Sequence, residues 1–152
     1  MIEVSNNKTL KLNNVLIRKY ETDNFNNFDA DKVIEQMKSY IKSKGNSVIG
    51  PVIQMSKSIE LNDCRKDIEV FYMLQCSNPV HNVDNEYSFK NTLKVDNCMY
   101  CRYTGPEDKL SLAYEKIYIV AFESGIELDN EVYSIYLKND NEMMVDIFIK
   151  KD

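Results

Sequence analysis

Tryptophan is absent from this chain of 152 residues, and histidine, proline and glycine are scarce, with one, three and four copies. The single histidine, His81, lies in a polar stretch over residues 77–86. A Ser-His-Asp or Cys-His catalytic group built on a rigid element is therefore not expected. Long apolar runs are also missing, and the N-terminus lacks the basic and apolar regions of a secretion signal. The sequence predicts neither membrane insertion nor export, and a cytoplasmic location is expected.

Charge is modest and is not concentrated in one place. The 19 basic and 24 acidic residues give a net charge of −5, and no basic stripe is visible. Binding to a nucleic-acid backbone depends on clustered Lys and Arg, so nucleic acid is not an expected partner. A length of 152 residues with 43% hydrophobic residues predicts one globular domain over residues 1–152.

The four cysteines include a C-x-x-C motif, Cys98 and Cys101, with Cys64 and Cys76 twelve residues apart. A zinc ribbon needs two such motifs on turns, whereas this one lies in a strand-like run. On a strand, Cys98 and Cys101 point to opposite faces, which opposes disulfide closure. We expect buried cytosolic thiols, with no metal and no cofactor.

An internal similarity relates residues 12–76 to residues 95–150. Gly45 and Gly125 each end a helical pattern and are followed seven residues later by Val52 and Val132, which open apolar strands. Strand-like blocks correspond at 15–20 and 98–103, and at 68–71 and 145–148. Two such βαββ units are expected to form one curved antiparallel sheet, with both helices on one face and a cleft between the repeats. Residues 77–94 are expected to be a polar connection.

The first helix is expected to begin at Asp29, as its N-cap, with Phe28 packing onto Val33. Apolar residues recur at helical spacing as far as Ile41, and the pattern ends at Gly45.

The second helix is expected to start at Gly105-Pro106, with Pro106 as its first residue, and to end at Gly125. The side opposite its main apolar stripe is also apolar, through Leu112, Ile119, Val120 and Phe122. Either residues 80–94 or a second subunit would cover this side, and the first alternative is favoured.

Several short motifs in order carry a family resemblance. They are Gly50-Pro51, Asp67-x-Glu69-Val70, Tyr103-Thr104-Gly105-Pro106, Leu110-x-x-Ala113-Tyr114, Gly125, Glu131-Val132-Tyr133 and Asp146-Ile147. Together they resemble the gyrase-inhibitor-like (GyrI-like) domain, the effector-binding part of many AraC-type and MerR-type regulators, which also occurs alone. The resemblance implies a duplicated βαββ fold whose cleft takes lipophilic, often cationic molecules. No helix-turn-helix module is visible, so the stand-alone form is expected.

Glu131 matches the pocket carboxylate of that family. The repeat itself singles it out, because Gly45 plus six is Pro51 whereas Gly125 plus six is Glu131. A carboxylate among aromatic rings attracts an organic cation by charge and by cation–π contact. We therefore expect Glu131 to bind the ligand.

Strand alternation supplies the other candidate ligand-binding residues. Each shares a face with a neighbour or ends one of two equivalent strands: Glu69 and Phe71, Tyr133 beside Glu131, Asp146 and Phe148, and Tyr20 and Tyr103. The alternative is ordinary sheet packing, with the acids in solvent. The residue after Gly105-Pro106, commonly aromatic in the family, is Glu107 here.

Three classes of function follow. The first is non-catalytic binding of a small hydrophobic or cationic ligand in the cleft. The second is a protein-interaction role, with a protein partner or a homodimer. The third is a hydrolase in which Glu131 acts as base and Tyr133 or Tyr103 orients water. The binding protein is favoured, and the hydrolase ranks last because no second activating group is visible.

Overall fold

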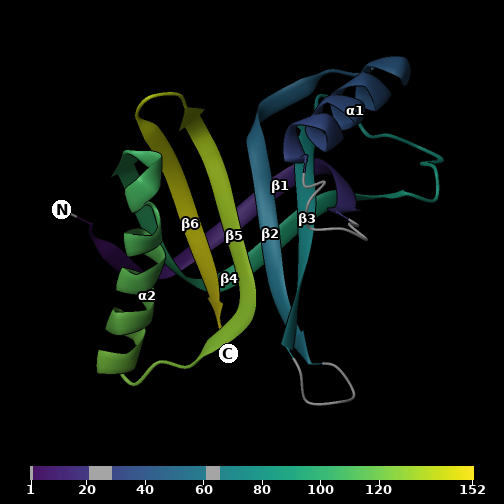
Figure 1. Cartoon of the computed structure of the whole chain (residues 1–152). Helices are drawn as coiled ribbons and strands as arrows, with labels where there is room; N and C mark the ends of the chain where they lie inside the picture. The colour runs from purple at the N-terminus through teal and green to yellow at the C-terminus, as the bar shows by residue number, and fades with distance from the viewer. Residues whose placement is uncertain (1, 21–28, 61–65) are drawn as a thin grey trace.

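The computed structural model describes residues 2–20, 29–60 and 66–152 (Figure 1). Its elements follow the order strand, helix, strand, strand twice. They are β1 (Val4–Tyr20), α1 (Ala30–Ser43), β2 (Val48–Glu60), β3 (Lys66–Cys76), β4 (Tyr87–Gly105), the 3₁₀ helix η2 (Glu107–Lys109), α2 (Ser111–Glu123), β5 (Leu128–Asn139) and β6 (Met143–Lys151).

All strand pairs are antiparallel, and the order β1-β3-β2-β5-β6-β4 closes into a barrel. The prediction of an α+β fold with a curved antiparallel sheet is confirmed, but it did not include this closure. The sheet closes because β1 and β4 are longer than expected, beginning at Val4 and Tyr87 instead of near residues 12 and 95. Residues 4–18 and 87–101 pair along nearly their whole length and cross behind the other strands (Figure 1).

The segment over residues 77–94 differs from the expected polar connection, because its second half is strand. Tyr87 opens β4, is buried, and stacks on Tyr40 of α1 with ring centroids 4.3 Å apart. Leu93 is buried inside the barrel, while Lys94 and other polar residues on either side of it are exposed. The polar composition therefore reflects a strand with one exposed face.

Helix α1 begins and ends as the sequence predicts. The Asp29 side chain accepts a hydrogen bond of 3.1 Å from the backbone N–H of Lys32, which confirms the N-cap. Gly45, just beyond the helix, has φ of +72°, a conformation that favours glycine. The expected contact of Phe28 with Val33 lies outside the described residues.

Helix α2 starts later than predicted. Pro106 has an extended backbone, η2 follows, and α2 begins at Ser111. The carbonyl of Pro106 accepts hydrogen bonds from the Tyr103 hydroxyl and from the N–H of Lys109, so the chain first makes a 3₁₀ turn. A Cβ atom on Gly105 would lie 2.8 Å from the Tyr103 hydroxyl oxygen, so a larger residue there would have to displace the Tyr103 ring.

No described segment covers the outward side of α2. The favoured prediction, that residues 80–94 cover it, is therefore wrong. Val80 and Tyr87 instead pack in the cluster beneath α1. Leu112, Ile119 and Phe122 on α2 are 50%, 52% and 87% exposed. The connection turns away because β4 pairs with β1 on the side of the barrel that carries α1.

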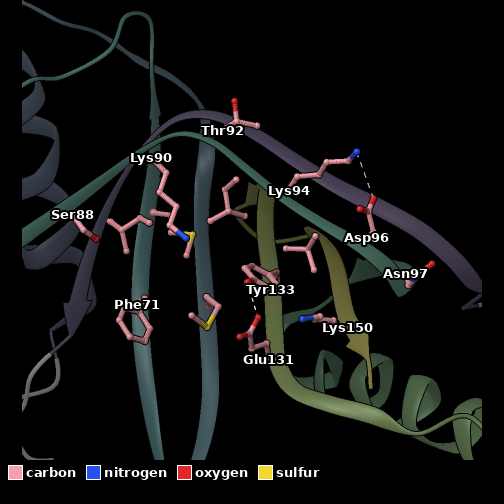
Figure 2. A pocket seen from close by; sticks show the side chains of 15 residues that line it. Phe71, Ser88, Lys90, Thr92, Lys94, Asp96, Asn97, Glu131, Tyr133 and Lys150 are labelled. Carbon is pink, nitrogen blue, oxygen red and sulfur yellow. Dashed lines mark hydrogen bonds and ion pairs between the residues drawn. The ribbon is translucent and has the colours of Figure 1, made fainter.

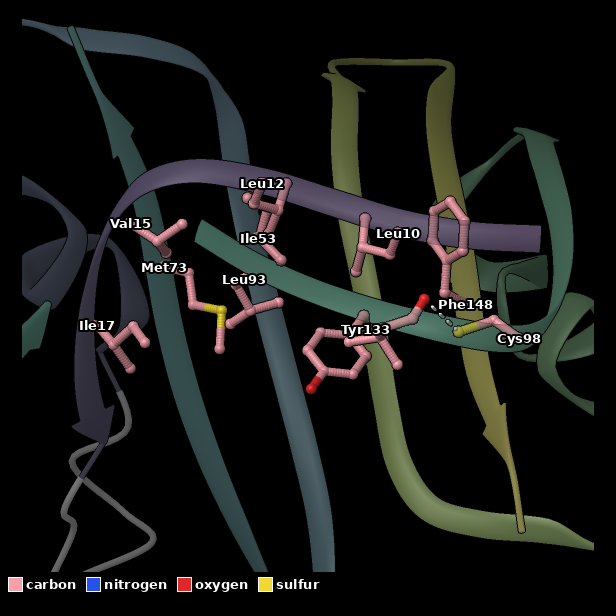
Figure 3. Close-up of a cluster of buried hydrophobic side chains, with 11 residues drawn as sticks. Leu10, Leu12, Val15, Ile17, Ile53, Met73, Leu93, Cys98, Tyr133 and Phe148 are labelled. Carbon is pink, nitrogen blue, oxygen red and sulfur yellow. Dashed lines mark hydrogen bonds between the residues drawn. The ribbon is translucent and has the colours of Figure 1, made fainter. Parts of the chain in front are cut away.

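The core consists of three clusters separated by the sheet. Figure 3 shows the one inside the barrel, which includes Val15, Met73 and Tyr133. The other two lie on the outer face, beneath α1 and beneath α2. Cys98 is buried inside and Cys101 beneath α2, so these cysteines point to opposite faces as predicted. No helix in the described ranges has the length and apolar character needed to cross a membrane.

Candidate functional site

Two hollows lie on opposite faces of the sheet, and both are lined by both halves of the chain. The inner hollow, inside the barrel, has a volume of about 730 Å³, and the outer cleft, beside α1, about 390 Å³. The inner hollow is lined by Ile17, Met55, Phe71, Met73, Ser88, Lys90, Thr92, Leu93, Lys94, Val95, Asp96, Asn97, Glu131, Tyr133 and Lys150 (Figure 2). The outer cleft is lined by Ala30, Asp31, Ile34, Glu35, Lys38, Val52, Gln54, Tyr72, Glu107, Tyr136 and Met143.

The inner hollow exists because two neighbouring strands of the closed sheet separate there. β4 pairs with β6 only from Cys98 onward, whereas residues 87–97 pair with β1 alone among the described strands. The open stretch of β4 therefore arches over the inner faces of β3, β2 and β5 (Figure 2). Apolar side chains from these strands form the walls of the hollow.

Glu131 and Tyr133 meet in the inner hollow. The Tyr133 hydroxyl donates a hydrogen bond of 3.0 Å to Oε2 of Glu131. Tyr133 is 5% exposed, and burial, followed by the nearby Glu131 charge, raises the pKa of its hydroxyl above the ordinary value. Tyr133 therefore stays neutral at physiological pH and holds the Glu131 carboxylate in one orientation.

Basic residues surround Glu131 within the sheet. Lys57 on β2 is the direct cross-strand partner of both Glu69 and Glu131, and residues paired in this way have side chains on the same face. Glu69 also forms an ion pair of 2.6 Å with Lys19. Lys150, from β6, lines the hollow on the other side of Glu131. Glu131 is therefore one member of a row of alternating charges.

The lining of the inner hollow carries a net positive charge. Lys90, Lys94 and Lys150 stand against Asp96 and Glu131, a balance of +1. A cation that approaches Glu131 would therefore meet more positive than negative charge.

Three of the eight candidate ligand-binding residues line this hollow: Phe71, Tyr133 and Glu131. Asp146 and Phe148 line a neighbouring hollow of about 590 Å³. The carboxylate of Asp146 accepts two hydrogen bonds from Arg102, of 2.8 and 3.0 Å, and one of 2.8 Å from the Tyr100 hydroxyl. These bonds raise the pKa of the Arg102 guanidinium, so the two charges offset each other.

Glu69, Tyr20 and Tyr103 lie outside the inner hollow. Glu69 is paired with Lys19, as described above. The Tyr20 hydroxyl accepts a hydrogen bond of 2.9 Å from the N–H of Asp29, and its ring meets Tyr72 edge-on at 6.0 Å. Tyr103 is buried beneath α2. Both tyrosines support the ends of the helices, so Tyr103 is not placed to orient water beside Glu131.

Tyrosines form the floor of the outer cleft. Tyr72 is 3% exposed, and the Tyr136 hydroxyl donates to Oε1 of Gln54 at 3.5 Å. Burial is the main cause of a raised Tyr136 pKa, and the hydroxyl of Tyr114 adds to it. Tyr114 in turn shares a hydrogen bond of 2.6 Å with Ser134, the buried polar residue of β5.

Acidic residues dominate the rim of the outer cleft. Asp31, Glu35 and Glu107 stand against Lys38, a balance of −2. Glu35 pairs with Lys38 at 3.5 Å, whereas Asp31 and Glu107 form no ion pair with another described residue. Sequence reasoning did not assign these residues to a site. The glutamate after Gly105-Pro106, where the family is commonly aromatic, was the available signal.

Neither hollow has the chemistry of a metal centre. No group of three or more metal-ligating side chains occurs in the described ranges. The described residues that line the inner hollow include no histidine and no cysteine. Both hollows instead combine charge with apolar or aromatic surface, as small-molecule sites do.

Comparisons with known proteins identify the fold. No protein-family model matches the sequence, and neither does any curated protein. EcmrR, solved in a complex with DNA, matches with a TM-score of 0.72 and 16% identity over 99% of this chain. The chain spans 57% of the length of EcmrR.

Two proteins from Listeria innocua are also similar. A hydrolase matches with a TM-score of 0.63 and 13% identity, over 97% of this chain and 92% of its own. An uncharacterized conserved protein matches with a TM-score of 0.61 and 13% identity, over 99% of this chain and 92% of its own. These likenesses confirm, at the level of the fold, the resemblance of this chain to the GyrI-like domain.

Proposed function

We propose that this protein binds a small lipophilic cation, without catalysis, in the outer cleft. The observation that carries the proposal is the combination of a tyrosine floor with an acidic rim, where Asp31 and Glu107 have no basic partner among the described residues. The fold is shared with effector-binding domains, and this likeness also supports the binding of a small molecule.

Two attractions would act together on a cation in the outer cleft. Aromatic faces attract an organic cation by about 0.5–2 kcal/mol, depending on how far it is desolvated. The rim carboxylates are exposed, so they contribute a weaker attraction that salt screens. No shape-specific hydrogen bond is required, which suits a range of ligands.

Two probes of similar shape and opposite charge test the proposal. Tetraphenylphosphonium should raise the melting temperature of the protein, because a ligand that binds only the folded state stabilises it. Tetraphenylborate should raise it much less. The effect of tetraphenylphosphonium should fall in Glu107→Gln and persist in Glu115→Gln, a control on the exposed side of α2. Equal effects of both probes, or no effect of either, would contradict the proposal.

Glu131 remains a predicted ligand contact, and the same experiment separates the two carboxylates. Glu131→Gln should leave tetraphenylphosphonium binding unchanged if the cation occupies the outer cleft. Loss of binding in Glu131→Gln, with Glu107→Gln unaffected, would assign the cation to the inner hollow.

A protein-interaction role is the second candidate, favoured by the bare side of α2. Phe122, at 87% exposure, lies on one side of the helix with Leu112 and Ile119. Exposed apolar surfaces of this kind often mark contacts with other proteins. Sedimentation of the wild type and of Phe122→Glu tests for a homodimer. A monomer in both would exclude self-association through this surface.

A further inference from the structure

The inner hollow has the opposite charge to the outer cleft and a wall that no proposed function uses. The wall of β1, β2 and β3 is continuous and apolar, formed by Ile17, Met55, Phe71 and Met73. The volume of the inner hollow, about 730 Å³, falls within the range of small-molecule sites.

Lysines reach the hollow from two sides. Lys90, on the open stretch of β4, forms no ion pair with a described residue, and its ammonium group points down into the hollow (Figure 2). Lys150 extends from β6 toward Glu131 in the same view, and its only described ion pair is a long one of 3.8 Å with Asp129. Lys94 points away, toward Asp96 at 3.9 Å.

We propose that the inner hollow is a second binding site, which takes a single-tailed amphiphile with one anionic group, such as a carboxylate. The tail lies on the apolar wall formed by Phe71 and Met73. The anionic group lies beside the ammonium group of Lys150, next to Glu131, and Lys90 on the opposite side of the hollow adds a longer-range attraction. The site is separate from the outer cleft because the sheet lies between them.

The Glu131 carboxylate should oppose the binding of this ligand. The carboxylate of Glu131 is fixed by Tyr133 beside the position of the anionic group, so it repels an anion. Removing its charge should strengthen anion binding. If Glu131 instead received a cation, the same substitution would weaken binding of that cation.

The test is calorimetric titration of the full chain with three ligands that share a ten-carbon tail: decanoate, decyltrimethylammonium and decyl glucoside. Decanoate should bind most tightly. Lys150→Gln should weaken decanoate binding about three- to tenfold at low salt, because a nearby, partly exposed charge is lost, and the more distant Lys90→Gln should weaken it less. Lys116→Gln, on the exposed side of α2, is the matched control and should have no effect. Glu131→Gln should tighten decanoate binding by a similar factor.

Further arms settle the location and the source of the ligand. Saturating tetraphenylphosphonium should leave decanoate affinity unchanged, and competition between them would overturn a separate site. Decanoate binding no tighter than that of decyl glucoside, or unchanged in both lysine variants, would also overturn it. Binding to phosphatidylglycerol vesicles without binding of free decanoate would assign the lysines to a membrane surface and reject the site. Circular dichroism confirms that each variant is folded.

Discussion

The inner hollow and the outer cleft are built from opposite faces of the same strands, yet their charges are opposite. On β5, Tyr133 points into the barrel and Tyr136 points out to the cleft, because they are an odd number of residues apart. Tyr133 meets a glutamate that lysines surround. Tyr136 lies beneath a rim where acids exceed bases.

The difference shows that a carboxylate next to an aromatic ring does not by itself identify a cation site. Glu131 has such a ring, but its cross-strand partner is Lys57 and Lys150 lies on its other side. Glu107 has no basic partner among the described residues. The neighbours across the strands, which the linear sequence does not show, decide what each carboxylate attracts.

The largest expected effect is on the reactivity of the cysteines that are buried on the two faces of the sheet. Cys98 is buried inside the barrel and Cys101 beneath α2, and burial raises the pKa of Cys101 to about 11 from 9.0. At pH 8 the thiolate fraction of Cys101 should therefore be about 100-fold lower in the folded protein than in the unfolded chain. Alkylation should slow accordingly, because only the ionised thiol reacts. In a Cys64→Ser background, the folded protein should resist alkylation at Cys76, Cys98 and Cys101, and urea should restore reaction. Rapid alkylation of the folded protein would mean that one face opens readily.

The next largest effect should follow from reversing the charge at the rim of the outer cleft. Asp31→Lys with Glu107→Lys should weaken tetraphenylphosphonium binding by at least about tenfold at low salt, and less at high salt. Glu115→Lys with Glu123→Lys makes the same change in net charge on α2, away from the cleft, and is the control. Titration calorimetry at two salt concentrations measures the difference. An equal loss in both pairs would show that net charge, and not the cleft, attracts the cation.

A smaller effect separates the two tyrosines of β5. Tyr136→Leu should weaken tetraphenylphosphonium binding about two- to fivefold, because the ring face contributes about 0.5–1 kcal/mol. Tyr133→Leu, on the opposite face, should leave binding unchanged. The dissociation constants of the two variants, measured side by side, make the comparison, and a reversed order would move the cation to the inner hollow.

The last comparison concerns the stability of the two faces in alkali, where no ligand is involved. Burial raises the pKa of both Tyr133 and Tyr136, so the folded protein keeps these protons after the unfolded chain, with a pKa near 10.0, has lost them. Stability should therefore be unaffected below pH 10 and should fall above it, by about 1.4 kcal/mol per pH unit for each group.

The two tyrosines should respond differently to Glu131→Gln. The Glu131 charge is the second cause of the raised pKa at Tyr133 and is not a cause at Tyr136. The substitution should therefore lower the pKa of Tyr133 alone. Urea denaturation at pH 9 and pH 11 measures the loss of stability, and spectroscopic titration of the single Tyr→Phe variants assigns each pKa. Equal pKa changes at both tyrosines would contradict the separation of the two faces.

Local features of the fold were predictable from the sequence because they depend on neighbours along the chain. The cap at Asp29, the helix ends before Gly45 and Gly125, and the opposite faces of Cys98 and Cys101 all follow from local spacing. The start of α2 was missed because a proline followed by acidic residues suits the first turn of a 3₁₀ helix, which Glu107–Lys109 form, as well as that of an α-helix.

The candidate site was predicted only in part, for a related reason. Alternation identified Phe71 and Tyr133 as residues of one face, and both line the inner hollow with Glu131. It did not identify the outer cleft, whose acids come from α1 and η2, far apart in the sequence.

The sequence by itself determined the order of the elements, the N-cap of α1 and the face to which many strand residues point, because these depend on short-range geometry. Only the tertiary structure decided that the sheet closes, that Lys57 faces Glu131, and that Asp31 meets Glu107 at one cleft. Strand register and helix packing bring together residues from distant parts of the chain, and the charge of a site is the sum over those neighbours.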